Sequence, residues 1–401
     1  MASLYSLKSG SFLPFVLGLV LAYHVVILVE GGRDMASRLS EEEDLELERQ
    51  LNMLNKPPIK TMHNRWGDTY DCIEFHKQPA FDHPLLKHRA IPKKEETPSA
   101  RPHKTLMNEI EGCPKGTVPI RRTTKEDLVR AKHLSSSSNE PHRSFKAGAN
   151  IRPQGIKILG AAATANVWTP KVKKDQSSGA EIAIIAGPSE IRYGWTADPS
   201  MFGDNVTRTF LYWSGDALGY KTYCWNTLCP GFVQYDSTQP PVFYFSHISA
   251  VGGSQSEFHT RIEREELSGD WWLSVVLNLT AEDPPRFKIG YWPKELFPSF
   301  NPGAEYVYFG GRVTASFDSV APEMGSGNQP NDHSSDQTGY YSAIKYFDDF
   351  AAEIPNSNEV QIQVDCKGPL DSGQFDAIWD DDEDDVFAVV RFGGPGGWTC
   401  V

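Results

Sequence analysis

The sequence predicts an all-β chain, an antiparallel β-sandwich of the jelly-roll type, preceded by an irregular and partly helical segment. From about Ala147 onward, short apolar or alternating runs recur between Gly, Pro, Asn and Asp residues, as in antiparallel architectures. This half shows no sustained helical period. With 39% hydrophobic and 11% aromatic residues, the 401-residue chain is too apolar to be disordered and long enough for a large core.

The N-terminus carries a targeting signal. Lys8 precedes an apolar stretch from Phe12 to Val29, and a basic residue before an apolar core is typical of a secretory signal peptide, here residues 1–31. At about 18 residues the stretch is also just long enough to span a bilayer. We therefore expect a secreted, extracellular protein, with an N-terminal single-pass membrane anchor as the alternative.

A helix is expected over residues 38–55, with Ser40 as N-cap and Glu43 three residues later. Pro57 and Pro58 end it, and a Pro- and His-rich stretch follows to about Arg122. The polar run from Lys132 to Ser144 has the composition of a flexible linker exposed to proteases. The expected regions are therefore a first domain over 38–131, a linker over 132–146, and a second domain over 147–401.

The strands of the second domain follow from its short apolar runs. Gly, Pro, Asn and Asp punctuate these runs at intervals suited to strands rather than helices. They lie at 156–168, 180–187, 208–215, 241–248, 271–280, 286–292, 306–313 and 386–394. One sandwich of about 250 residues can contain all of these expected strands.

The charge balance limits the partners. A net charge of -13 and a pI near 5.4 argue against nucleic acid, because phosphate backbones attract basic surfaces. Two acidic runs, 41–44 and 380–385, are interpreted as solvated segments, and no spacing resembles a calcium-binding loop. We expect no metal ion and no cofactor.

Six cysteines, at 72, 113, 224, 229, 366 and 400, suggest a disulfide framework in a secreted chain. Six cysteines allow about 15 connectivities, so the count alone leaves the pairing open. A zinc clip at Cys224 and Cys229 is disfavoured, because no second pair and no nearby histidine accompany it. Two sequons, at Asn205 and Asn278, are candidate glycosylation sites.

Three segments of the first domain are LNKPPIKTMH, GDTYDCIEFHKQPAFDHPLLKH and CPKGTVPIRRT. They resemble the activation peptide of the neprosins, a family of secreted plant peptidases, and the resemblance assigns 38–131 to that region. NVWTPKV, GWTADPSMFGDNVTRTFLYW, YCWNTLCPGFVQ, IGYWPKELF and GGPGGWTC resemble the peptidase domain, which assigns 147–401 to a neprosin peptidase-like domain. The resemblance implies a removable propeptide that binds its own domain, and a proline-directed endopeptidase using two glutamates without a metal. It also implies the disulfides Cys72–Cys113, Cys224–Cys229 and Cys366–Cys400.

The catalytic positions depart from the family pattern. The resemblance places the two glutamates in the blocks IRYGW and FGGRV, where this chain has Arg192 and Arg312. A guanidinium stays protonated at physiological pH, so it can neither accept a proton from water nor donate one to a leaving group. Two arginines in one cleft repel each other unless an anion or a nearby acid lies between them, and they suit binding of a carboxylate, phosphate or acidic glycan.

Three hypotheses about function follow. The first is a neprosin-like protein without the usual catalysis. The second is an active acid prolyl endopeptidase with a displaced carboxylate pair. Glu190, on the strand face of Arg192, and Glu295 are its fallback residues, although a solvated turn residue is the simpler interpretation of Glu295. The third is an extracellular binding module for a Pro-rich protein or an acidic glycan.

Overall fold

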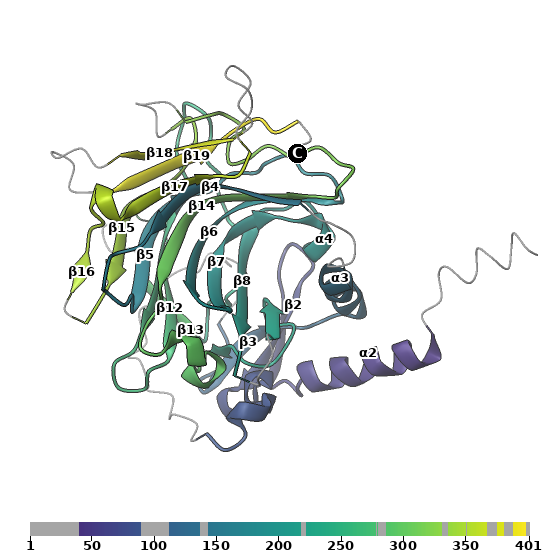
Figure 1. Ribbon diagram of the computed structural model, residues 1–401. Helices are drawn as coiled ribbons and strands as arrows, with labels where there is room; N and C mark the ends of the chain where they lie inside the picture. Colours follow the sequence, from purple (N-terminus) through teal and green to yellow (C-terminus); the bar gives the residue numbers. More distant parts are fainter. Residues whose placement is uncertain are drawn as a thin grey trace, which may run out of the picture. The chain divides into compact units, whose positions relative to one another are not determined.

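The computed structural model describes residues 40–89, 112–136, 143–217, 222–277, 279, 286–330, 336–349, 351–366, 375–380 and 388–397 (Figure 1). The chain divides into two compact units, Met1–Gln50 and Leu51–Val401. The structural statements below concern the described residues. The apolar stretch 12–29, expected as signal peptide or anchor, lies outside them.

The expected N-terminal helix is α2 (Glu41–Leu54). Ser40 begins it with a reciprocal cap. The Glu43 backbone N–H donates to Ser40 Oγ at 3.1 Å, and the Ser40 N–H donates to Glu43 Oε2 at 3.1 Å. Each bond satisfies a backbone donor that the first helical turn leaves without a partner. The prediction of this helix and of its cap is confirmed.

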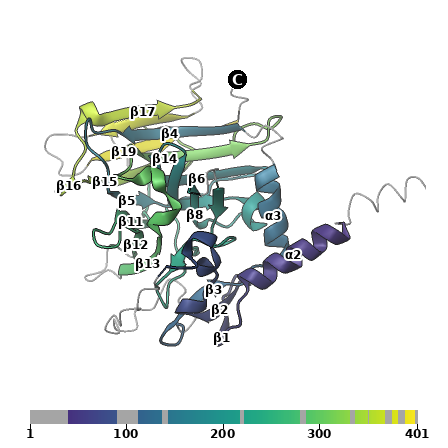
Figure 2. The same ribbon diagram turned by 60° about the horizontal axis from the view of Figure 1, so that its bottom comes forward.

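The segment after α2 is built from short elements, as its prolines require. Three antiparallel strands form a small sheet in the order β1-β2-β3 (Figure 2). These strands are β1 (Lys60–His63), β2 (Thr69–Glu74) and β3 (Thr117–Arg121), and the 3-10 helices are η1 (Phe75–Lys77), η2 (Pro79–Asp82) and η3 (Pro84–Leu86). The disulfide Cys72–Cys113 closes this segment on itself.

The linker prediction is wrong in part. Residues 132–136 belong to α3 (Lys125–Ser136), and residues 143–146 begin β4. A cap starts the helix, because the Asp127 N–H donates to Thr124 Oγ1 at 3.2 Å and the Thr124 N–H donates to Asp127 Oδ2 at 2.9 Å. A serine-rich composition does not exclude a helix, because the last turn of a helix tolerates serine.

The rest of the described chain forms two larger antiparallel sheets. In the first, seven strands run in the order β17-β4-β14-β6-β7-β8-β9. They are β17 (Val360–Val364), β4 (Arg143–Ile151), β14 (Tyr306–Ala315), β6 (Gln176–Ala186), β7 (Ser189–Ala197), β8 (Arg208–Gly215) and β9 (Thr222–Trp225). Figure 1 shows β4, β14, β6, β7 and β8 side by side in one curved layer.

The second sheet has nine described strands in the order β10-β13-β12-β11-β5-β15-β19-β18, with β16 paired to β15. They are β10 (Val233–Gln234), β13 (Arg286–Trp292), β12 (Trp271–Leu277), β11 (Glu257–Arg264), β5 (Gly160–Asn166), β15 (Gly339–Phe347), β19 (Val389–Gly393), β18 (Asp376–Asp380) and β16 (Ala352–Glu353). The short helices between strands are α4 (Pro199–Phe202), η4 (Lys294–Leu296), η5 (Pro298–Phe300) and η6 (Ser357–Glu359).

One core lies between the two sheets, so the prediction of an all-β sandwich is confirmed. Alternate residues of both sheets enter it, as the two-residue period of strands requires. Phe309 of the first sheet meets Tyr341 of the second with ring centroids 5.8 Å apart. Asp380, which begins the long acidic run, pairs with Arg391 at 2.8 Å, and residues 381–385 lie outside the described chain.

Two of the three implied disulfides are present, Cys72–Cys113 and Cys224–Cys229. Cys366 is also disulfide-bonded, and Cys400 lies outside the described residues. Asn205 is exposed, whereas the side chain of Asn278 is not described. Among the described helices, none is both long and apolar enough to cross a membrane.

Candidate functional site

Arg192 and Arg312 lie on the same face of the seven-stranded sheet. Arg192 belongs to β7 and pairs with Ala183, while Arg312 belongs to β14 and pairs with Gly179. Both partners lie on β6, four residues apart, so their side-chain positions share one face. The structure therefore brings the two positions together on either side of β6.

Between them on β6 lies Glu181, which is not among the site residues predicted from the sequence. Its neighbours across the strands are Gly310 on β14 and Gly194 on β7. Because neither glycine carries a side chain, both arginines have room to lean toward this carboxylate. Glu181 is only 1% exposed.

The acid and the two arginines form one ion-paired cluster. Arg312 Nε donates to Glu181 Oε1 at 2.8 Å, and its Nη2 lies 2.8 Å from the same oxygen. The remaining nitrogen, Nη1, donates to Ser144 Oγ at 2.9 Å. Arg192 Nη1 lies 4.0 Å from Glu181 Oε2. The nearby acid that a pair of arginines requires is thus supplied by the chain itself.

The electrostatics of the cluster keep Glu181 ionised. Burial by itself raises the pKa of this carboxyl, but the charges of Arg312, Arg192 and Lys146 outweigh burial and lower the pKa to about 2. Burial and the Arg312 charge lower the pKa of Lys146, whose ammonium lies 4.5 Å from the Tyr308 ring centroid. A carboxylate that titrates near pH 2 is a weak base and is not protonated under mildly acidic conditions.

Glu190, the first fallback residue, is held by Arg192. Arg192 donates from Nε to Glu190 Oε1 at 2.5 Å and from Nη2 to Glu190 Oε2 at 2.7 Å, a two-point contact. The guanidinium also covers the Tyr212 ring at 4.5 Å. Its proximity to Glu181 and its bonds to Glu190 raise the pKa of Arg192 despite the burial. The expectation that Glu190 shares a face with Arg192 is confirmed.

Glu295, the second fallback residue, lies elsewhere. It belongs to η4, and Arg89 Nη1 donates to its Oε2 at 2.5 Å. Arg89 also donates to Asp270, so Glu295 completes a three-residue ion pair. It does not belong to the residues that line the cleft described next.

A cleft of about 800 Å³, including open solvent, lies beside this cluster. Glu181 and Arg312 line one part of it, and Met201, Phe210 and Trp225 supply an apolar wall. Strands of this sheet carry most of the lining residues, and α4 contributes Ser200 and Met201. The cleft thus joins a charged end to an aromatic wall.

Two further carboxylates line the cleft, and both have structural partners. Asp175 accepts a hydrogen bond from Ser316 Oγ at 2.6 Å and another from Ser319, and these bonds lower its pKa. Asp198 caps α4 by accepting the Met201 N–H at 3.0 Å. Neither arrangement supplies the protonated acid that peptide hydrolysis by two carboxylates needs.

A signal for Glu181 was present in the sequence. In the run Ala180–Gly187 it is the single charged residue among apolar ones. A charge in a strand that is otherwise apolar needs a partner, because its burial without one is costly. The strand register that identifies the partners as Arg192 and Arg312 is a property of the folded sheet.

The family model described as Neprosin matches residues 174–395, and that described as Neprosin activation peptide matches residues 61–174. Scytalido-glutamic peptidase with a transition state analog inhibitor is 12% identical, with a TM-score of 0.34, over 63% of this chain and 98% of that one. SCP-B, a member of the Eqolisin family of peptidases in complex with the tripeptide Ala-Ile-His, is 11% identical, with a TM-score of 0.33 and the same coverage. Since the first model spans more than half of the chain, the protein belongs to the neprosin family.

Proposed function

We propose that this neprosin-family protein binds an extended polypeptide in its cleft without hydrolysing it. The observation that carries the proposal is the ion-paired cluster of Arg192, Glu181 and Arg312. Guanidinium groups stand where the resemblance implies catalytic glutamates. They stay protonated at neutral and acidic pH, so they cannot exchange protons with water or a leaving group.

Hydrolysis of a peptide bond by two carboxylates needs one ionised group to activate water and one protonated group to donate a proton. Glu181 lines the cleft, but its pKa of about 2 leaves it ionised at mildly acidic pH, so it has no proton to donate. Glu190 is bound at both oxygens by Arg192, and Glu295 is bound by Arg89. The alternative of an active acid peptidase with a displaced pair therefore has no support from the positions of its fallback residues.

The cleft wall supports a Pro-rich polypeptide as ligand. Aromatic faces such as those of Trp225 and Phe210 are suitable platforms for proline rings. An acidic glycan is less well supported, because Glu181 already pairs with Arg312 and two more carboxylates, Asp175 and Asp198, line the same space. The disulfides suit an oxidising compartment, so we propose that the protein acts in the secretory pathway or outside the cell.

The experiment compares binding and cleavage of one Pro-rich peptide by the purified protein. The expected result is saturable binding with no product at neutral or acidic pH. Cleavage at proline by the wild-type protein would contradict the proposal. It would do so most strongly if the cleavage survived Glu190→Gln, which removes the better-placed fallback residue.

A gain-of-function variant completes the test, and its design follows from Glu181. Arg192→Glu with Arg312→Glu alone would place two new carboxylates beside the buried Glu181, where like charges repel. Adding Glu181→Gln removes that charge and keeps a hydrogen-bonding side chain. We expect the triple variant to cleave in acid. The two variants that carry one arginine change each, with Glu181→Gln, should show little activity, because one acid cannot serve as both base and donor.

A further inference from the structure

A buried amide pair ties residues 51–131, called the segment below and matched by the activation-peptide model from residue 61 onward, to the sandwich. Gln78 Nε2 donates to the Gln234 carbonyl at 3.0 Å, and the Gln234 N–H donates to Gln78 Oε1 at 2.8 Å. Gln234 Nε2 in turn donates to the Pro119 carbonyl at 2.6 Å. Gln78 and Gln234 are each 2% exposed. A buried amide without a hydrogen-bond partner lowers the stability of the fold, so separating the segment from the sandwich is unfavourable for both Gln78 and Gln234.

An aromatic stack makes a second contact. Trp66 lies flat on Tyr244 with ring centroids 4.3 Å apart and planes inclined by 7°. On the other face of the stack, the Arg208 guanidinium lies 4.3 Å from the Tyr244 ring and 4.4 Å from Phe202. Arg208 is 2% exposed, and the stack that covers it begins on the segment.

Apolar packing and an ion pair make the third and fourth contacts. Phe75 and Val118 of the segment share a buried cluster with Trp272 and Tyr291 of the nine-stranded sheet. Arg89 binds both Asp270 and Glu295, and the Asp270 side chain is 3% exposed. The segment therefore covers an apolar cluster of the nine-stranded sheet that is separate from the core between the two sheets.

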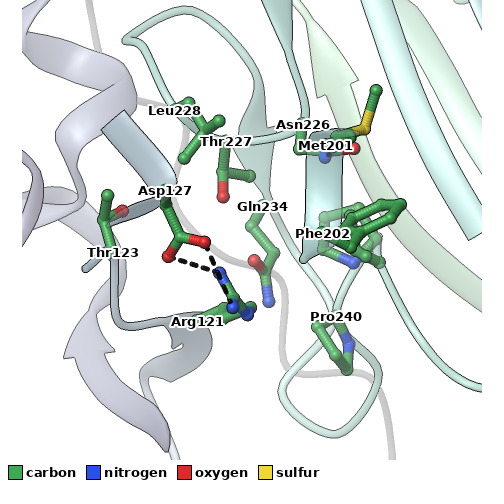
Figure 3. A pocket seen from close by; sticks show the side chains of 12 residues that line it. Arg121, Thr123, Asp127, Met201, Phe202, Asn226, Thr227, Leu228, Gln234 and Pro240 are labelled. Carbon is green, nitrogen blue, oxygen red and sulfur yellow. Dashed lines mark hydrogen bonds and ion pairs between the residues drawn. The ribbon is translucent and has the colours of Figure 1, made fainter. Parts of the chain in front are cut away.

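The segment also meets one wall of the cleft. Arg130 Nε of α3 donates to the Met201 carbonyl of α4 at 3.2 Å. A pocket of about 480 Å³, including open solvent, lies at this junction, where Arg121 and Asp127 from the segment face Met201 and Phe202 (Figure 3). Met201 lines both this pocket and the cleft. The segment therefore contacts α4 on the side away from the cleft. None of the described residues of the segment lines the cleft itself.

We infer from these contacts that the described residues of the segment, 51–89 and 112–131, are a permanent part of the folded protein. A chain cut between Ser136 and Arg143 stays together as a two-piece protein, in contrast to the removable propeptide that the family resemblance implies. The amide pair, the stack and the apolar cluster contain no group that changes charge between about pH 4 and pH 8, so mild acid leaves these three contacts intact. His83 of the segment, whose ring centroid lies 6.2 Å from that of Trp213 on β8, is the titrating group beside them; burial lowers its pKa, so its protonation in acid weakens the contact without removing the other three. The inference does not depend on the proposed function.

The experiment uses the full chain with a sequence-specific protease site inserted between Ser136 and Arg143. The cut protein is diluted to about 10 nM, within the affinity range of stable interfaces, and run on a sizing column at neutral pH. The expected result is co-elution of both pieces. The described disulfides do not hold them together, because Cys72–Cys113 lies within the first piece and Cys224–Cys229 within the second. Separate elution of the smaller piece in native buffer would overturn the inference.

A matched pair of variants tests which contacts hold the pieces. Gln78→Ala should raise the dissociation rate of the cut protein about tenfold or more, because it leaves Gln234 without its partner. Gln361→Ala, at an exposed glutamine of β17, is the control and should leave the rate unchanged. Equal rates for both variants would show that the buried amide pair does not hold the segment, against the inference.

Discussion

Replacing Arg312 by methionine tests whether the buried charge of Glu181 is stabilised by its ion pair. Methionine fills similar space but removes both guanidinium contacts to Glu181 and the contact to Ser144. Glu181 remains buried, and a buried carboxylate is disfavoured without a partner. We expect the variant to be less stable than the wild type at neutral pH.

The pKa of Glu181 gives the magnitude. The value falls from 4.5 to about 2 in the folded protein, and at about 1.36 kcal/mol per pKa unit the difference amounts to about 3 kcal/mol. Because the folded pKa is lowered, this stabilisation is fully present above pH 4.5 and is lost as the pH falls toward 2. Arg312 is the largest of the charges that offset burial, so we expect its removal to cost most of this free energy.

The assay is denaturant unfolding of both proteins at several pH values. Without Arg312, burial raises the pKa of Glu181, so the acid becomes neutral in the folded variant at mildly acidic pH. The stability deficit should therefore be about 3 kcal/mol at pH 7 and should shrink as the pH is lowered through 4.5. Arg312→Met combined with Glu181→Gln should recover most of the loss at pH 7.

The control is Arg286→Met, an exposed arginine of β13, which should change stability by no more than about 0.5 kcal/mol. A deficit that is the same at pH 4 and pH 7 would refute the reasoning. So would a double variant that recovers nothing, because the cost would then come from packing rather than from the charge of Glu181.

Three further predictions follow from the contacts of the segment and the cleft. Arg89→Met should destabilise the protein by about 3 kcal/mol in thermal or chemical unfolding, because it leaves the buried Asp270 without its cation; a loss below about 1 kcal/mol would contradict this. Burial lowers the pKa of His83, so stability should fall as the pH drops below 6.5, and His83→Gln should weaken this pH dependence; an NMR titration of His83 above 6.5 would refute the sign. Trp225→Ala should weaken binding of a Pro-rich peptide about tenfold, whereas unchanged affinity would place the ligand elsewhere.

The sequence alone was sufficient to predict an element where residues within that element supply its cap or its buried face. The helix at 41–54 follows from Ser40 and Glu43, whose side chains and backbone groups cap each other. The sandwich follows from short alternating runs, because one buried face of a strand needs an apolar residue at every second position. The linker prediction was partly wrong because it rests on composition alone, whereas Thr124 and Asp127 cap a helix that extends to Ser136.

For the candidate site, too, the sequence alone determined some properties and the tertiary structure determined others. From the sequence come the identities of Arg192 and Arg312 and, since proton exchange is a property of the side chain, the chemistry that they exclude. Only the tertiary structure decided that Glu181 lies between them and that Glu295 pairs with Arg89 instead. The reason is that strand register and sheet order set which side chains meet, and these depend on the packing of the whole sheet. The type of a side chain fixes which protons it can exchange, whereas the fold determines which other side chains it contacts.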